Sequence, residues 1–240
     1  MFILPINKDN PVRRIPWVVL ALIVANSIIL AFTYNPPAAL FLHYGFVPAH
    51  PHLRTMLTSM FLHAGFWHLA GNMFFLWMFG NQVENTFGSW LFAVTYVLCG
   101  FSADGLHYLL NPGSAIPCVG ASGAISGIVG VYFVLFPKAR FDLEIYFGWW
   151  HLKTIPTRTQ GAVGAWVAEQ FVLGLLTQMT HATSIAFWAH VGGFAAGVVA
   201  GLVFKLAVPE KRRRALQRAE PWYMQDRFNR DDSSITQLKL

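Results

Sequence analysis

The chain has 240 residues, of which 55% are hydrophobic and only 12% are charged. Soluble domains carry about 25% charged residues, so this composition excludes both a disordered chain and a water-soluble globule of this size. The two cysteines, Cys99 and Cys118, are too few for a disulfide scaffold or a four-cysteine zinc site. The composition therefore indicates a polytopic membrane protein.

Six apolar runs are long enough to cross a bilayer, which takes about 20 helical residues per crossing. They cover residues 17–34, 60–79, 90–110, 116–136, 161–180 and 184–207. We find no sustained alternation of apolar and polar residues of the kind that predicts strands. We therefore expect an all-α bundle of six transmembrane helices over residues 17–207. A short N-terminal segment over residues 1–16 precedes it, and a basic tail over residues 208–240, expected to be mobile, follows it.

The basic residues predict which side of the membrane each loop occupies, because loops rich in Lys and Arg stay in the cytoplasm. With a cytoplasmic N-terminus, six spans place every Lys and Arg except Arg54 on the cytoplasmic side. Five or seven spans would move a basic loop or the basic tail to the outside. We expect both termini to be cytoplasmic. The net charge of +6 is then explained by contact with anionic lipid and requires no nucleic-acid partner.

Polar residues in three of the spans lie at similar expected depths. At a rise of 1.5 Å per residue, Ser122 and His190 lie roughly 9 Å below the outer ends of their spans, and His68 lies roughly 12 Å below its own. Polar groups at such depths are costly in lipid, so they tend to face a water-filled interior or a partner. The agreement indicates a site that is open to water from outside.

Small residues recur on one face of the fourth and of the last span, as Gly123, Gly127, Gly193, Gly197 and Gly201. Such faces let helix backbones approach closely in a membrane. If these two spans pack through them, Ser122 comes within hydrogen-bond reach of His190. A serine beside a histidine is the minimal activated nucleophile, with the histidine as general base.

Three motifs follow in order along these spans: His68-x-x-x-Asn72, Gly120-Ala121-Ser122-Gly123 and Ala189-His190-Val191-Gly192-Gly193. Over residues 57–204 the chain resembles the rhomboid family of intramembrane serine proteases. The resemblance implies that Ser122 is the nucleophile and His190 its base, without an acidic third member. It assigns His68, Asn72 and the Ser122 backbone N–H to an oxyanion hole. At i and i+4 on a helix, His68 and Asn72 would project from one face as paired donors.

The resemblance also suggests supporting roles. His63 matches a recurrent histidine with a structural or water-holding role, Gly120, Gly123 and Gly193 belong to the motifs, and Trp166 with Gln170 matches part of a substrate gate in the fifth span. Some relatives place a tyrosine four residues after the nucleophile, where its ring stacks on the base. Ser126 occupies that position here, so the group that orients His190 is left open.

These observations predict a serine endopeptidase that needs no metal or cofactor. Its partners would be the lipid bilayer and single-span membrane proteins, which it would cleave in or beside the transmembrane segment near the external face. The compact six-span form favours a bacterial inner membrane. No oligomeric state is predicted, and the sequence does not name the physiological substrate.

Other functions stay open from the sequence alone. His63, His68, His107 and His190 could ligate haem or a metal, although the zinc-protease signature His-Glu-x-x-His is absent. Asp104 and Glu169 could serve a small polytopic transporter, and the sequence offers no partner for Glu169. An inactive rhomboid-like protein that binds other membrane proteins is a further alternative. Such relatives usually lack the serine or the histidine, and this chain has both.

Overall fold

The computed structural model describes residues 2–7, 14–34, 36–147, 149–180 and 186–211. The tail expected over residues 208–240 lies outside these ranges from residue 212 onward. The helices are α1 (Trp17–Phe32), α2 (Ala38–Tyr44), α3 (Leu53–Ser59), α4 (Phe66–Phe87), α5 (Ser89–Leu110), α6 (Ser122–Leu135), α7 (Thr159–Thr180) and α8 (Phe187–Ala207). The strands are β1 (Phe2–Asn7), β2 (Arg140–Phe147) and β3 (Trp150–Arg158).

A long helix occupies each of the six predicted runs, namely α1, α4, α5, α6, α7 and α8. Of the described helices, α5 and α8 are long and apolar enough on their own to cross a membrane, and α1 and α6 are shorter apolar helices. Helices α4 and α7 have 22 residues each but carry more polar side chains. Two helices begin six residues later than expected: α4 at Phe66 instead of residue 60, and α6 at Ser122 instead of residue 116.

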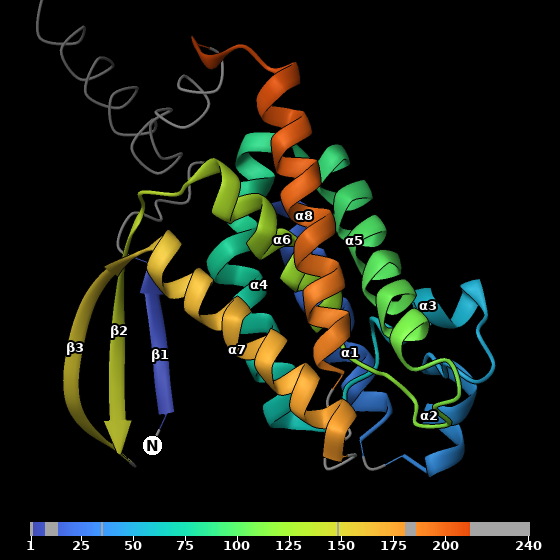
Figure 1. The fold of residues 1–240 in the computed structure, drawn as a ribbon. Coiled ribbons are helices and arrows are strands. Elements are labelled where there is room, and N and C mark those ends of the chain that lie inside the picture. The colour runs from blue at the N-terminus through green and yellow to red at the C-terminus, as the bar shows by residue number, and fades with distance from the viewer. Residues whose placement is uncertain (1, 8–13, 35, 148, 181–185, 212–240) are drawn as a thin grey trace, which may run out of the picture.

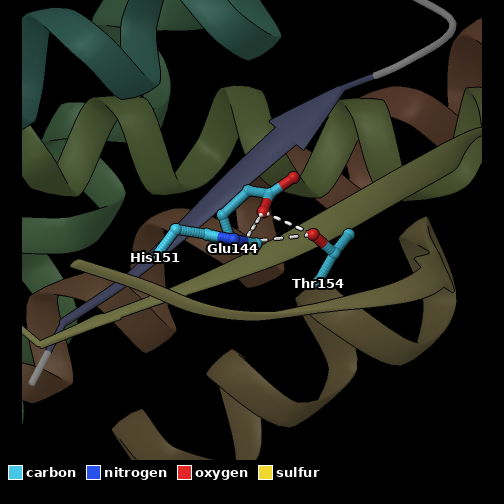
Figure 2. A network of polar contacts seen from close by, with 3 residues as sticks. All are labelled: Glu144, His151 and Thr154. Carbon is cyan, nitrogen blue, oxygen red and sulfur yellow. Dashed lines mark hydrogen bonds and ion pairs between the residues drawn. The ribbon is translucent and has the colours of Figure 1, made fainter.

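The described chain is mostly helical, as expected, but it also contains a three-stranded antiparallel sheet in the order β1-β2-β3, which the sequence analysis did not predict. The signal is present in β2, where Phe141, Leu143 and Ile145 alternate with charged residues. In the register of the sheet, Glu144 faces Thr154, whose hydroxyl donates a 2.7 Å hydrogen bond to the carboxylate. His151 contacts the same oxygen atom (Figure 2).

The sheet lies beside α7 on one side of the helix bundle, and α2 and α3 lie on the other side (Figure 1). Of the described hairpin residues, the one buried in the bundle core lies at the beginning of β2. Phe141 is fully buried, and its ring stacks on Phe79 of α4 at 5.7 Å between centroids. The aromatic residues near the hairpin turn are exposed, Trp149 at 97% and Trp150 at 76%.

Helix α6 is the centre of the bundle, in contact with α4, α5 and α8 (Figure 1). Every residue from Gly123 to Tyr132 is buried. The small-residue faces pack α6 against α8 as predicted. A Cβ added to Gly193 would overlap the carbonyl oxygen of Gly123, and one added to Gly197 would overlap that of Gly127. These two pairs advance together along the chain, so α6 and α8 run parallel in direct backbone contact.

A buried carboxylate joins the end of α4 to the beginning of α1. Glu84 accepts hydrogen bonds from the backbone N–H groups of Val18 at 3.0 Å and Val19 at 2.9 Å, and from the Ser89 hydroxyl at 2.6 Å. The first N–H groups of a helix have no partner within the helix, and a negative charge there is favourable. This side chain therefore fixes α1 against the α4–α5 turn.

Candidate active site

Ser122 and His190 form a hydrogen-bonded pair at the contact between α6 and α8. The distance from His190 Nε2 to Ser122 Oγ is 2.9 Å. Ser122 is the first residue of α6, and His190 is the fourth residue of α8. Both side chains are half-buried, so they are shielded but still accessible. The sequence-predicted pair is therefore brought together by the contact between Gly123, directly after Ser122, and Gly193, about one turn after His190.

His190 is held on its other nitrogen by Gln170 of α7. Gln170 Oε1 lies 2.7 Å from His190 Nδ1, and the Gln170 side chain is 7% exposed. An amide oxygen can only accept, so this contact assigns the proton of a neutral imidazole to Nδ1. The lone pair of Nε2 then faces the Ser122 hydroxyl, which is the arrangement that a general base requires.

Gln170 is therefore the residue that orients His190, which the sequence had left open. The sequence associated it with a substrate gate and did not assign it this contact. Trp166, one turn earlier on the same face of α7, places its ring 6.2 Å from the His190 ring at 33°. Ser126, which takes the place of the stacking tyrosine, turns to its own helix and donates to the Ser122 carbonyl at 2.6 Å. The i, i+4 spacing of Trp166 and Gln170 was the available signal.

The three residues that were predicted to lie at similar depths occupy similar positions in their helices. His68, Ser122 and His190 all lie in the first turns of their helices, α4, α6 and α8. The first backbone N–H groups of each helix have no partner within the helix. At α6 these include the N–H groups of Ser122 and Gly123, which lie beside the serine hydroxyl. The site therefore combines side chains with the positive end of a helix dipole.

His68 and Asn72 lie next to the chain just before Ser122. The backbone N–H of Ala64 donates to His68 Nδ1 at 3.3 Å, so a neutral His68 carries its proton on Nε2. Asn72 Nδ2 donates one hydrogen to the His68 carbonyl at 3.0 Å, and the amide has a second hydrogen to offer. Both nitrogens can therefore act as hydrogen-bond donors at this position.

Gly120 leaves the space in which these donors act. A Cβ at this position would lie 2.8 Å from His68 Nε2 and 3.7 Å from Asn72 Nδ2. Its φ of +120° also lies in a region that residues with a side chain rarely adopt. A glycine is needed here for both reasons. Because Gly120 has no side chain, a small space stays open beside it. This space is bordered by His68, Asn72 and the start of α6.

The other residues singled out in the sequence lie around this centre. His63 is 1% exposed, and its ring lies 5.2 Å from that of His68. Asp104 is buried and accepts a 3.3 Å hydrogen bond from Ser59 Oγ. Glu169, by contrast, is exposed on α7. Among the described residues, no three His, Cys, Asp or Glu side chains are grouped so that they could hold a metal ion.

The comparisons with known proteins agree on one family. Residues 50–206 match the family described as "Rhomboid domain". The chain is 32% identical over 178 residues to "Rhomboid protein 1, mitochondrial" of Saccharomyces cerevisiae, covering 70% of this chain and 47% of that protein. It is 30% identical over 149 residues to "Rhomboid protease GluP" of Bacillus subtilis, covering 61% of this chain and 26% of that protein. The chain therefore spans less than half the length of these relatives.

The contact between Gln170 and His190 predicts that Gln170→Leu slows the reaction of Ser122 with a fluorophosphonate by about tenfold to a hundredfold, because His190 loses the acceptor that fixes its proton. The measurement is the rate of covalent labelling in detergent. Gln170→Glu, which keeps an acceptor, should restore most of the rate. Gln160→Leu, an exposed glutamine on the same helix, is the matched control. Equal labelling rates for Gln170→Leu and Gln160→Leu would contradict the assignment.

Proposed function

Because this chain belongs to the rhomboid family, we propose that it is an intramembrane serine endopeptidase. The family consists of integral membrane proteins and includes serine proteases. The observation that carries the proposal is the 2.9 Å contact between Ser122 Oγ and His190 Nε2, with Gln170 on the opposite nitrogen. Of the alternatives, an inactive binding protein would have no need for a base held in this tautomer.

The reaction proceeds in two halves. His190 Nε2 takes the proton of the Ser122 hydroxyl as Oγ attacks the scissile carbonyl carbon. The carbon–nitrogen bond then breaks, the leaving amine takes that proton from His190, and the acyl group stays on Ser122 as an ester. A water molecule then gives a proton to His190 and attacks the ester. When the ester bond breaks, the proton returns to Ser122 Oγ and the carboxylic acid product leaves.

The negative charge that develops on the carbonyl oxygen is stabilised by donors that are already in place. His68 Nε2–H and the second amide hydrogen of Asn72 border the volume beside Gly120, and the free N–H groups at the start of α6 point to the same end of the helix. Preorganised donors of this kind are worth roughly 10²–10³ in rate each. Together these groups form the proposed oxyanion hole.

The substrate is a membrane protein whose backbone carbonyl can reach Ser122. In an intact helix every carbonyl inside the segment accepts a hydrogen bond from the residue four positions later. The scissile segment must therefore unwind. Because Ser122 lies at the first residue of α6, cleavage takes place in the half of the membrane in which α6 begins, which the proposed topology makes the external half. Small or helix-destabilising residues in the substrate should favour it.

The pairing of β1 with β2 supports the proposed topology of six crossings with both termini in the cytoplasm. Strands that pair by hydrogen bonds lie together, so β1 and β2 cannot be on opposite sides of the membrane. Between them the chain contains four long helices, α1, α4, α5 and α6, and an even number of crossings returns it to the same side. The hairpin carries Lys153 and Arg158, which favours the cytoplasmic side.

Relatives of the chain include bacterial and mitochondrial proteins. We assign the chain to a bacterial inner membrane because of its compact six-helix form. In this setting the active site opens to the external face, and both termini are assigned to the cytoplasm.

The proposed activity predicts cleavage of a single-span membrane protein by the purified chain in detergent. Ser122→Ala and His190→Ala should each abolish cleavage, because the nucleophile or its base is lost. Ser126→Ala is the matched control, since this buried serine lies one helical turn later and bonds only to its own helix in the described contacts. A chelator should leave the rate unchanged. Cleavage by Ser122→Ala at the rate of the unmodified chain would refute the proposal.

The proposed topology predicts which positions react with a membrane-impermeant maleimide. With Cys99 and Cys118 replaced by alanine, Ile6→Cys on β1 and Lys153→Cys on β3 should both react in inside-out vesicles. Ala115→Cys, in the exposed loop before α6, should react only after permeabilisation. Labelling of Ile6→Cys and Lys153→Cys from opposite sides of the membrane would contradict both the pairing of the strands and the proposed topology.

A further inference from the structure

A cavity lies between α2 and α3, away from Ser122. Its volume is about 430 Å³, within the range of roughly 300–1,000 Å³ that is typical of small-molecule sites. The residues that line it include His43, His50, His52 and Arg54, together with the apolar side chain of Leu42. The proposed peptidase reaction uses none of these residues.

The lining of this cavity is basic. Arg54 lies 3.5 Å from His43 through Nη2 and Nε2, and its guanidinium lies 5.8 Å from the centre of the Tyr44 ring. His50 and His52 border the same space, and the described lining residues include no carboxylate. Arg54 is always charged and offers five N–H donors in a planar fork that matches phosphate or carboxylate oxygens. The cavity therefore suits an oxyanion.

The walls of the cavity are held in place before any ligand binds. The segment between α2 and α3 is tied to the loop that precedes α6 by backbone hydrogen bonds. Phe46 and Cys118 exchange two of them, at 3.0 and 2.7 Å, and Ala49 N–H donates to the Ser114 carbonyl at 2.9 Å. A Cβ at Gly45 would overlap the Phe41 carbonyl oxygen, so the turn there is also tightly packed. A preformed site loses little affinity to ordering.

The same two helices expose a strip of apolar side chains beside the basic cavity. Leu42 is 55% exposed, Leu53 is 75% exposed and Leu57 is 41% exposed. In a membrane protein, apolar side chains at the end of the bundle contact acyl chains. Helices α2 and α3 lie at the end of the bundle where α5 finishes and the loop toward α6 begins (Figure 1). In the proposed topology this end faces the external membrane surface. A ligand here can therefore combine an anionic head with apolar chains.

We propose that the cavity between α2 and α3 binds the phosphate of a phospholipid headgroup, with the acyl chains lying along Leu53 and Leu57. The side chains of His43, His50, His52 and Arg54 surround the phosphate oxygens. A soluble acidic peptide would pair with the basic side chains but leave the leucines exposed. A neutral lipid would cover the leucines but leave the basic side chains without an anion. This site does not depend on the peptidase activity.

The test titrates the full chain, in neutral maltoside micelles, with dioleoylphosphatidylglycerol and counts bound lipids by native mass spectrometry. The variant His52→Gln/Arg54→Gln should bind this lipid about tenfold more weakly, because it loses the guanidinium and one imidazole from the lining of the cavity. The matched control, His151→Gln/Arg158→Gln, removes the same two residue types from β3 and should bind as the unmodified chain does. His50→Gln, a single exposed change, should weaken binding in the same direction.

Three further ligands identify the source of the phosphate. Dioleoylglycerol, which has the same chains without phosphate, should not compete for the site. Inorganic phosphate and a soluble glutamate-rich peptide should compete only at far higher concentrations than the phospholipid. Equal lipid binding by His52→Gln/Arg54→Gln and the control pair would overturn the proposal. Competition by free phosphate or by the peptide at concentrations similar to those of the lipid would overturn the assignment to a phospholipid.

Discussion

Helices α6 and α8 approach each other so closely that their backbones touch at Gly123 and Gly193, and again at Gly127 and Gly197. In lipid there is little hydrophobic drive between helices, and close van der Waals contact takes its place. This contact sets the separation of the two helices, and the separation sets the distance from Ser122 to His190. A helix spacing larger by the width of one methyl group would break a 2.9 Å hydrogen bond.

The apolar environment of the membrane also explains why the partner of His190 is a neutral side chain. A carboxylate beside the imidazole would stabilise the imidazolium, but burying it within a membrane domain would carry a large desolvation cost. The Gln170 amide fixes the ring and its proton without placing a charge there. The α6 N-terminus likewise supplies positive potential through backbone N–H groups, without a buried cation. The site is therefore built from dipoles, in keeping with a chain that has few charges to place.

Much of the fold and of the candidate site could be predicted from the sequence. The features that were not predicted were missed for physical reasons. Ser122, His190 and the glycine faces were predictable because depth along a helix follows from residue count. The Gln170 contact was not, because sequence spacing within α7 does not give the distance to another helix. The sheet was missed because eight residues of alternation in β2 are short beside runs of 20 apolar residues. Its first strand pairs across four intervening long helices, which no local pattern reveals.

The most direct test is the effect of Gly197→Ala on the reaction of Ser122 with a fluorophosphonate. Gly197 lies one turn beyond Gly193 and touches the Gly127 backbone, so a methyl group there must push α6 and α8 apart. The labelling rate of Gly197→Ala should be at least about tenfold lower, whereas Gly164→Ala, where a Cβ meets nothing within 4 Å, should keep the full rate. Labelling of Gly197→Ala at the unmodified rate would contradict the account.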